Sequence, residues 1–343
     1  MDENTSHHQQ SLSHPVLPKG RLDWKVEVAK GPIVALSPMD GYTDSAYRQI
    51  AKIVEPNSYV FCEFVSADGL SRARRKMSKL VQFNPAIERP YIVQIFGKNP
   101  QAFAEAAQFL EEFGVDGIDI NYGCPSKKVV GSGHGSSMIR TPCLAAECVA
   151  AVKNAVKIPV TTKTRLGWED HSTLIDFVGT LIEAGSEMIT IHGRTVKQQY
   201  MGEANWDPIY ELKRKYPDTP ILGNGDVTSG AIAKSKLGNL DGMMIGRASF
   251  GNPWILKEIY AELHGLPYTP PTPEEKGEII RKHAELLIDT KGEYRAMKEF
   301  RKHLLNFTKG FPGSRELRGQ MTSIESMDDI ERVVEQIMRG SQE

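Results

Sequence analysis

The sequence predicts an α/β fold: a TIM (β/α)8 barrel followed by a small C-terminal all-helical domain. Eight short apolar runs recur before residue 267, amphipathic helical patterns such as 102–113 and 144–156 separate them, and strand signals then stop. Eight strand–helix units over about 230 residues match a TIM barrel in count and length. An open doubly wound sheet is the alternative, but no G-x-G-x-x-G segment follows the first run. The predicted strands are 33–36, 59–62, 91–96, 118–120, 160–163, 188–191, 221–223 and 243–245.

The chain divides into three predicted segments. Residues 1–22 are polar and predict a disordered tail. Residues 23–266 form the predicted barrel, and a proline-rich linker ends it. Residues 273–343 carry only helical patterns and form the predicted helical domain.

Composition limits the possible functions. The 343 residues are 40% apolar, enough for one large core and a smaller one. The formal net charge of −1 predicts no global attraction to polyanions, so a nucleic-acid partner would need a local basic patch. The four cysteines form no C-x-x-C pair, which argues against a zinc ribbon or a disulfide framework, and no metal site is predicted. With neither a signal peptide nor a membrane-spanning run, we expect a cytoplasmic protein without a membrane partner.

Polar residues stand at or just after the ends of six predicted strands, where a buried strand gives way to a loop. A barrel gathers such side chains around one mouth, the usual place for catalysis. They are Gln94, Asn121, Lys163, His192, Asn224 and Arg247.

Cys124 is the most informative of the mouth residues. It follows the strand 118–120 within Asn121-Tyr122-Gly123-Cys124-Pro125, and a long glycine-rich loop comes next. A buried structural cysteine is the alternative interpretation. The glycine and proline residues around Cys124 favour an exposed loop and a chemical role.

The last two strands end in glycine-rich turns, 223–226 and 246–247. In TIM barrels these loops often bind phosphate, because glycine lets backbone N–H groups approach the oxygens. Arg247 adds a bidentate donor, whereas two tight turns without a ligand are the alternative. Lys163 and Arg165 share one face of their strand and need an electron-rich ligand. FMN has both a phosphate and a ring system that suits such cations.

Residues 291–308 predict a helix with an apolar stripe and a basic stripe beside it. The basic stripe contains Lys291, Arg295, Lys298 and Lys302. It is either a solvated face or a surface for an anionic partner.

Seven segments, in chain order, resemble the motifs of one family. From about residue 33 to the C-terminus the chain resembles the tRNA-dihydrouridine synthases, flavin-dependent enzymes that modify RNA. The matching segments are SPMDGYTD (37–44), QIFG (94–97), NYGCP (121–125), KTR (163–165), HGRT (192–195), NGD (224–226) and GR (246–247).

The resemblance implies an FMN-bearing barrel, NADPH as reductant, tRNA as substrate and reduction of the C5–C6 bond of uridine, and we expect a monomer. Cys124 matches the general acid, and Asn121, Arg165 and Tyr200 would meet the uracil together with Lys163. The helical domain would bind tRNA, where the basic stripe offers Lys291, Arg295 and Lys298. The implied cofactor-binding residues are Pro38, Met39, Asp40, Gln94, Lys163, His192, Asn224, Gly225, Asp226, Gly246 and Arg247.

Two rival functions remain open from the sequence. A dihydroorotate dehydrogenase-like enzyme would share the phosphate site and a loop acid, but it would not need the basic helical domain. An RNA-binding module without catalysis would not need Cys124 or the complete set of flavin positions.

Overall fold

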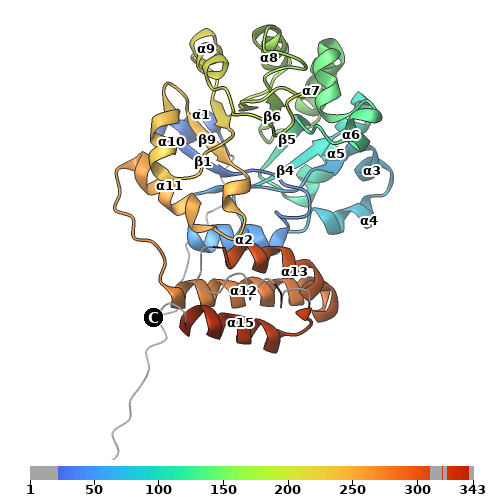
Figure 1. Cartoon of the computed structure of the whole chain (residues 1–343). Coiled ribbons are helices and arrows are strands. Elements are labelled where there is room, and N and C mark those ends of the chain that lie inside the picture. The colour runs from blue at the N-terminus through green and yellow to red at the C-terminus, as the bar shows by residue number, and fades with distance from the viewer. Residues whose placement is uncertain (1–21, 310–318, 320–322, 340–343) are drawn as a thin grey trace, which may run out of the picture.

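Parallel strands of the computed structural model close into a barrel ringed by helices (Figure 1). The strands are β1 (Ile33–Leu36), β2 (Tyr59–Phe61), β3 (Val65–Ser66), β4 (Tyr91–Phe96), β5 (Gly117–Tyr122), β6 (Val160–Arg165), β7 (Ile189–His192), β8 (Ile221–Asn224) and β9 (Gly242–Ile245). Their order is β2-β1-β9-β8-β7-β6-β5-β4, and β2 also pairs with β4, while the short β3 extends the sheet beside β4. This closure excludes the open doubly wound sheet and confirms the TIM barrel.

The structure describes residues 22–309, 319 and 323–339, so the predicted tail lies outside the described residues except for Leu22. Strand ends differ slightly from the prediction. β5 and β6 run on through Tyr122 and Arg165, because polar residues near their ends hide how far the strands extend.

Helices follow most strands and begin at local signals. The side chain of Asn99 caps α5 and Pro100 occupies its first turn, while Gly114 ends it in the left-handed region. The helices of the barrel are α1 (Trp24–Ala29), α2 (Ser45–Val54), α3 (Ala67–Arg72), α4 (Arg74–Met77), α5 (Pro100–Phe113), α6 (Lys127–Gly131), α7 (Pro142–Ala155), α8 (Leu174–Glu183), α9 (Asp207–Lys215), α10 (Gly230–Leu237) and α11 (Trp254–His264). Three short 3₁₀ helices are η1 (Ser78–Leu80), η2 (Gly135–Arg140) and η3 (Arg247–Ser249).

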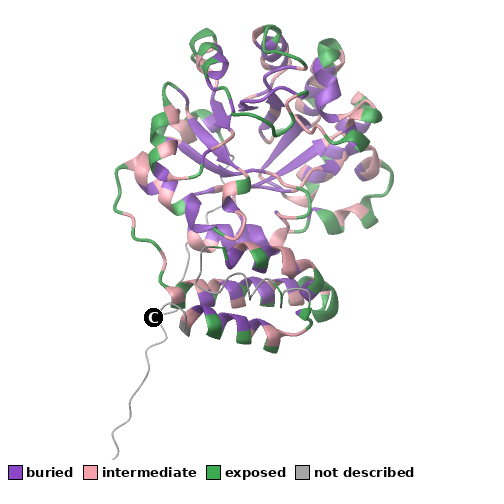
Figure 2. Cartoon of the chain, in the orientation of Figure 1, coloured by how far each residue is buried: buried purple, intermediate pink, exposed green. Residues whose placement is uncertain are grey.

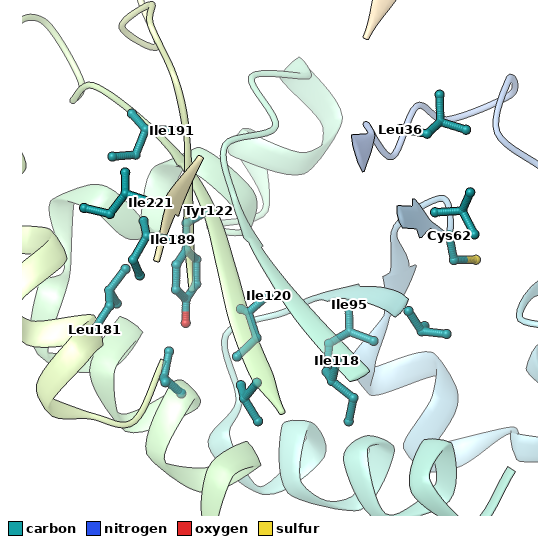
Figure 3. Packing of buried hydrophobic residues seen from close by; sticks show 14 of the residues in the cluster. Leu36, Cys62, Ile95, Ile118, Ile120, Tyr122, Leu181, Ile189, Ile191 and Ile221 are labelled. Carbon is teal, nitrogen blue, oxygen red and sulfur yellow. The ribbon is translucent and has the colours of Figure 1, made fainter. Parts of the chain in front are cut away.

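Alternate residues of the strands enter two apolar cores. Val34 and Leu36 pack outward with the helices, in the cluster to which Ile118, Ile120 and Ile189 belong (Figure 3). Ile33 and Ala35 face the barrel interior, where Trp24 of α1 joins their cluster. Figure 2 shows the result, with buried strands at the centre and exposed residues on the outer turns of the helices.

An irregular linker follows α11, and from Pro273 onward the described elements are helices, as predicted. The helical unit consists of α12 (Pro273–Lys291), α13 (Glu293–Phe307) and α15 (Met327–Arg339). It packs beneath the barrel against α2 (Figure 1). Its core contains Phe300, Leu304 and Val334 and includes Ala46 of α2 and Trp254 of α11.

The predicted single helix from residue 291 is wrong. Lys291 is the last residue of α12, and Gly292 follows with φ +75°, a backbone conformation that glycine adopts without strain. Lys291 therefore does not share a helix with Arg295 and Lys298, which lie on α13.

Candidate active site

A cavity of about 1010 Å³ opens at the C-terminal ends of the strands. It brings together every candidate residue that the sequence placed in the barrel. These are Pro38, Met39, Asp40, Gln94, Asn121, Cys124, Lys163, Arg165, His192, Tyr200, Asn224, Gly225, Asp226, Gly246 and Arg247.

The half-buried Lys163 and the buried His192 form a polar part of this cavity. Lys163 Nζ donates to Asn224 Oδ1 over 3.1 Å, and Asn224 Nδ2 donates to the Met244 carbonyl over 2.7 Å. Burial, and then the charge of Arg165, lower the pKa of Lys163 to about 8. Burial and the surrounding cations hold the pKa of His192 well below its ordinary value, so its imidazole is neutral at neutral pH.

Asp226 organises the turn after β8. Arg194 Nη1 and Nη2 donate to its two oxygens over 2.9 and 2.7 Å, and the Ala204 N–H donates over 2.8 Å. Burial opposes ionisation, yet these bonds hold the pKa of Asp226 below its ordinary value. Arg247 Nη2 lies 3.4 Å from the same carboxylate, so Asp226 also contacts the arginine that we predict to bind phosphate. Gly225 enters the turn with φ +122°, a conformation that side chains rarely adopt.

The Cys124 loop is anchored at both ends. Asn121 Oδ1 accepts the N–H groups of Gly123 and Cys124 over 3.1 and 2.9 Å, and the Cys124 carbonyl accepts the Ser136 N–H over 3.2 Å. Gly135 has φ +58°, and a Cβ there would lie 3.1 Å from the Cys124 carbonyl oxygen. Burial raises the pKa of the Cys124 thiol, so the sulfur stays protonated at neutral pH.

Arg165 and Arg247 both lie close to the ring of the exposed Tyr200. Their guanidinium carbons are 5.4 and 5.0 Å from the centre of its ring, and 56% of Tyr200 is exposed. Arg165 is held by three carbonyls, those of Gly123 at 2.8 Å, Thr195 at 3.0 Å and Gln199 at 2.7 Å. The arrangement offers fixed cations and an aromatic surface to a planar, electron-rich substrate.

The predicted basic residues of the helical unit lie outside the cavity lining. Lys291 donates to Asp44 at the start of α2 and to Glu299, and Arg295 donates to Glu299 over 2.8 Å. Carboxylates therefore neutralise Lys291 and Arg295. Lys298 and Lys302 have no carboxylate partner among the described residues and lie over the rings of Tyr294 and Tyr42.

Sequence reasoning missed two residues that hydrogen-bond to residues of the cavity lining. Arg194 lies within the HGRT motif (192–195). Its two hydrogen bonds to Asp226 join two loops that meet only in the folded barrel, so the sequence does not reveal them. Asp119 is completely buried and hydrogen-bonded to Gln94 and Thr161. The signal available for Asp119 was an acidic residue inside an apolar strand.

Two further features bear on cofactors and membranes. No group of three or more His, Cys, Asp or Glu residues in the described ranges could hold a metal ion. No described helix is long and apolar enough to cross a membrane.

The fold and cavity define a class: a parallel β/α barrel enzyme that binds its ligands at the carboxyl ends of the strands. A family model described as dihydrouridine synthase matches residues 34–342. The chain belongs to this family, which confirms the resemblance and the prediction of an oxidoreductase.

Individual relatives agree with the family match. "Probable tRNA-dihydrouridine synthase 1" of Synechocystis sp. is 36% identical over 307 residues, which cover 88% of this chain and 85% of the relative. "Probable tRNA-dihydrouridine synthase" of Rickettsia prowazekii is 37% identical over 291 residues, covering 83% and 88%. Among solved structures, a complex of 2-naphthoyl-CoA reductase aligns with a TM-score of 0.51 at 11% identity. That alignment covers 68% of this chain and 50% of the reductase, and it supports the fold alone.

Proposed function

We propose that this protein reduces the C5–C6 double bond of uridines in tRNA, with FMN as cofactor, NADPH as electron donor and Cys124 as proton donor. One observation carries the proposal. The cavity holds a thiol that burial keeps protonated, together with the cations Lys163 and Arg165. A reduction that adds a hydride and then a proton needs this combination.

The donor set of the cavity fits FMN. Arg247 and the backbone N–H groups of the turns after β8 and β9 would hold the phosphate, as the chemistry of glycine-rich turns favours. Gln94, Lys163 and His192 would hydrogen-bond the ring system, and Pro38 to Asp40 would lie against it. When bound, FMN supplies a hydride to the substrate after reduction by NADPH.

The residues of the chain supply the rest of the chemistry. A hydride adds to C6 of the uracil, and negative charge builds on C5 and the adjacent carbonyl. Arg165 and Lys163 stabilise this charge, and Asn121 and Tyr200 orient the base. The Cys124 thiol gives its proton to C5, which completes the saturated C5–C6 bond, and solvent reprotonates the sulfur. The uridine must leave its stack to enter the cavity, which costs less in a tRNA loop than in a helix.

The helical unit supports the choice of tRNA over a free pyrimidine. On α13, Tyr294, Lys298 and Lys302 are spaced four residues apart and lie on one face. Lys302 lies over Tyr42, which lines the cavity and stacks on Phe250 with ring centres 3.9 Å apart. Tyr294 is 71% exposed, with Lys298 Nζ 3.9 Å from its ring centre. Unpaired cations alternating with aromatic rings suit an RNA strand that leads into the cavity.

The decisive experiment compares acceptors. Enzyme reduced with NADPH under anaerobic conditions is mixed with unmodified tRNA, with uracil or with orotate, and flavin absorbance is followed. We expect tRNA alone to reoxidise the flavin and to gain dihydrouridine. Reoxidation by a free pyrimidine would favour the dihydroorotate dehydrogenase-like alternative, and a preparation that binds tRNA without flavin would favour the non-catalytic module.

The monomeric state and cytoplasmic location remain predictions. Light scattering after size-exclusion chromatography, with and without tRNA, tests the first, and cell fractionation tests the second.

A further inference from the structure

Asp119 is a buried carboxylate that the proposed chemistry does not use directly. It lies in β5, and the strand register places it beside Gln94 of β4 and Thr161 of β6. Both oxygens are occupied: Thr161 Oγ1 donates to Oδ1 and Gln94 Nε2 donates to Oδ2, each over 2.6 Å. No ion pair within the described ranges includes Asp119, so its burial costs free energy that a functional role would explain.

The carboxylate dictates the orientation of the next amide. An ionised carboxylate only accepts hydrogen bonds, so it requires the N–H₂ side of Gln94. Gln94 Oε1 must then face Asn121, whose Nδ2 donates to it over 2.7 Å. With its N–H₂ group turned towards Gln94, Asn121 presents Oδ1 to the N–H groups of Gly123 and Cys124.

We infer that Asp119 is a positioning residue that fixes the Cys124 loop through the relay Gln94 and Asn121. If Gln94 turned its amide around, Asn121 would have to turn as well. Its N–H₂ group would then face two backbone N–H groups, and the loop would lose both hydrogen bonds. The Asp119 carboxylate thus sets the orientation of the Gln94 amide, which would meet the cofactor. Through that amide it also sets the position of the loop that carries Cys124.

The charge state of Asp119 strengthens this inference. Burial raises its pKa to about 6, and the hydrogen bonds from Thr161 and Gln94 oppose that rise. The ionised form that orders the relay therefore prevails at neutral pH.

The test reads out loop order by the alkylation rate of Cys124. It uses the full-length chain with excess FMN in a Cys143→Ser background, because Cys143 is exposed whereas Cys62 and Cys148 are buried. Iodoacetamide labelling of the Cys124 peptide is followed by mass spectrometry. We expect Asp119→Ala to speed labelling roughly tenfold, as expected for the loss of one or two net hydrogen bonds.

Matched variants separate positioning from packing. Asp119→Asn keeps the side-chain volume but not the acceptor-only carboxylate, because its N–H₂ group can face Gln94 while its oxygen still accepts from Thr161. This variant should therefore also speed labelling, by less than Asp119→Ala. Thr161→Val should stay near wild type, because the link to Gln94 survives. Gln94→Met cuts the relay at its second link and should reproduce the effect of Asp119→Ala, even if the alanine variant folds poorly.

The kinetic consequence rests on the proposed function and is measured separately. In Asp119→Ala, kcat for dihydrouridine formation should fall while KM for tRNA stays constant. Equal labelling rates in wild type, Asp119→Ala and Gln94→Met would overturn the inference. If labelling follows the expected pattern but the wild type makes no dihydrouridine, the proposed function fails and the inference stands.

Discussion

Lys291 at the end of α12 donates to the carboxylate of Asp44, 247 residues away in sequence, which caps α2 in the barrel. This pair joins the helical unit to the barrel. Burial opposes ionisation of Asp44, but Lys291 lowers its pKa to about 2. Lys291 therefore holds two parts of the fold together.

Replacement of Lys291 by Met should lower the free energy of unfolding by about 1–3 kcal/mol at pH 7, because the part-buried Asp44 carboxylate loses its cation. The pKa of Asp44 lies below its unfolded value of about 3.9, so this stabilisation is complete above pH 4 and lost as pH falls towards 2. Urea titrations at several pH values should show the difference in free energy of unfolding between wild type and variant becoming smaller over that range. Arg295→Met is the control; Arg295 is 72% exposed, so its loss should cost less than about 0.5 kcal/mol.

His283 should make the helical unit sensitive to acid. Its ring is buried among Tyr47, Phe300 and His303, and neither ring nitrogen has a hydrogen-bond partner among the described residues. Burial lowers its pKa to about 4, with Asp44 opposing and Lys291 and Lys302 adding to the shift. Its unfolded pKa is higher, near 6.5, so stability should fall by about 3 kcal/mol between pH 6.5 and 4.

His283→Leu should remove much of that pH dependence without loss of stability at pH 7. His303 has a pKa shifted in the same direction by burial and by His283, so a residual slope should remain. Thermal melts at several pH values measure both effects. Identical slopes in wild type and His283→Leu would contradict this account.

Cys124→Ala should abolish most dihydrouridine formation while FMN content and flavin reduction by NADPH stay normal. In the proposed reaction the thiol donates the proton, and the variant keeps the cations Lys163 and Arg165 in the cavity lining. Single-turnover oxidation of reduced enzyme by tRNA measures the step. Cys143→Ala, an exposed cysteine away from the cavity lining, is the matched control. Normal product yield in Cys124→Ala would refute the assignment.

Arg247→Ala should weaken FMN binding about tenfold. This effect lies at the lower end of the range for a charge-assisted hydrogen bond, because 54% of the side chain is exposed to solvent. Fluorescence titration of the flavin-free protein measures the dissociation constant. Arg214→Ala, an exposed arginine on α9, should leave it unchanged. Equal affinity in Arg247→Ala and wild type would place the phosphate elsewhere.

Lys298→Ala with Lys302→Ala should weaken tRNA binding and reduce its salt dependence by about 0.7 to 0.9 units of slope per lost phosphate contact. Tyr294→Ala should weaken binding further through lost base stacking, whereas Tyr294→Phe should retain the affinity. FMN content should stay normal in all of these variants. Filter binding at several salt concentrations distinguishes this surface from a solvated face, which predicts no change.

The sequence by itself determined the barrel, the helical end and the set of residues at the mouth. These depend on local signals: apolar runs of strand length, glycine turns, and polar residues at strand ends that any parallel barrel gathers on one side. Tertiary structure decided which charges neutralise one another. The ion pairs of Lys291 with Asp44 and of Arg194 with Asp226 form only because packing brings distant segments of the chain together. Asp119 gains its link to Gln94 only from the register of neighbouring strands. Burial and partner identity set the charge of such groups, and neither is encoded in spacing along the chain.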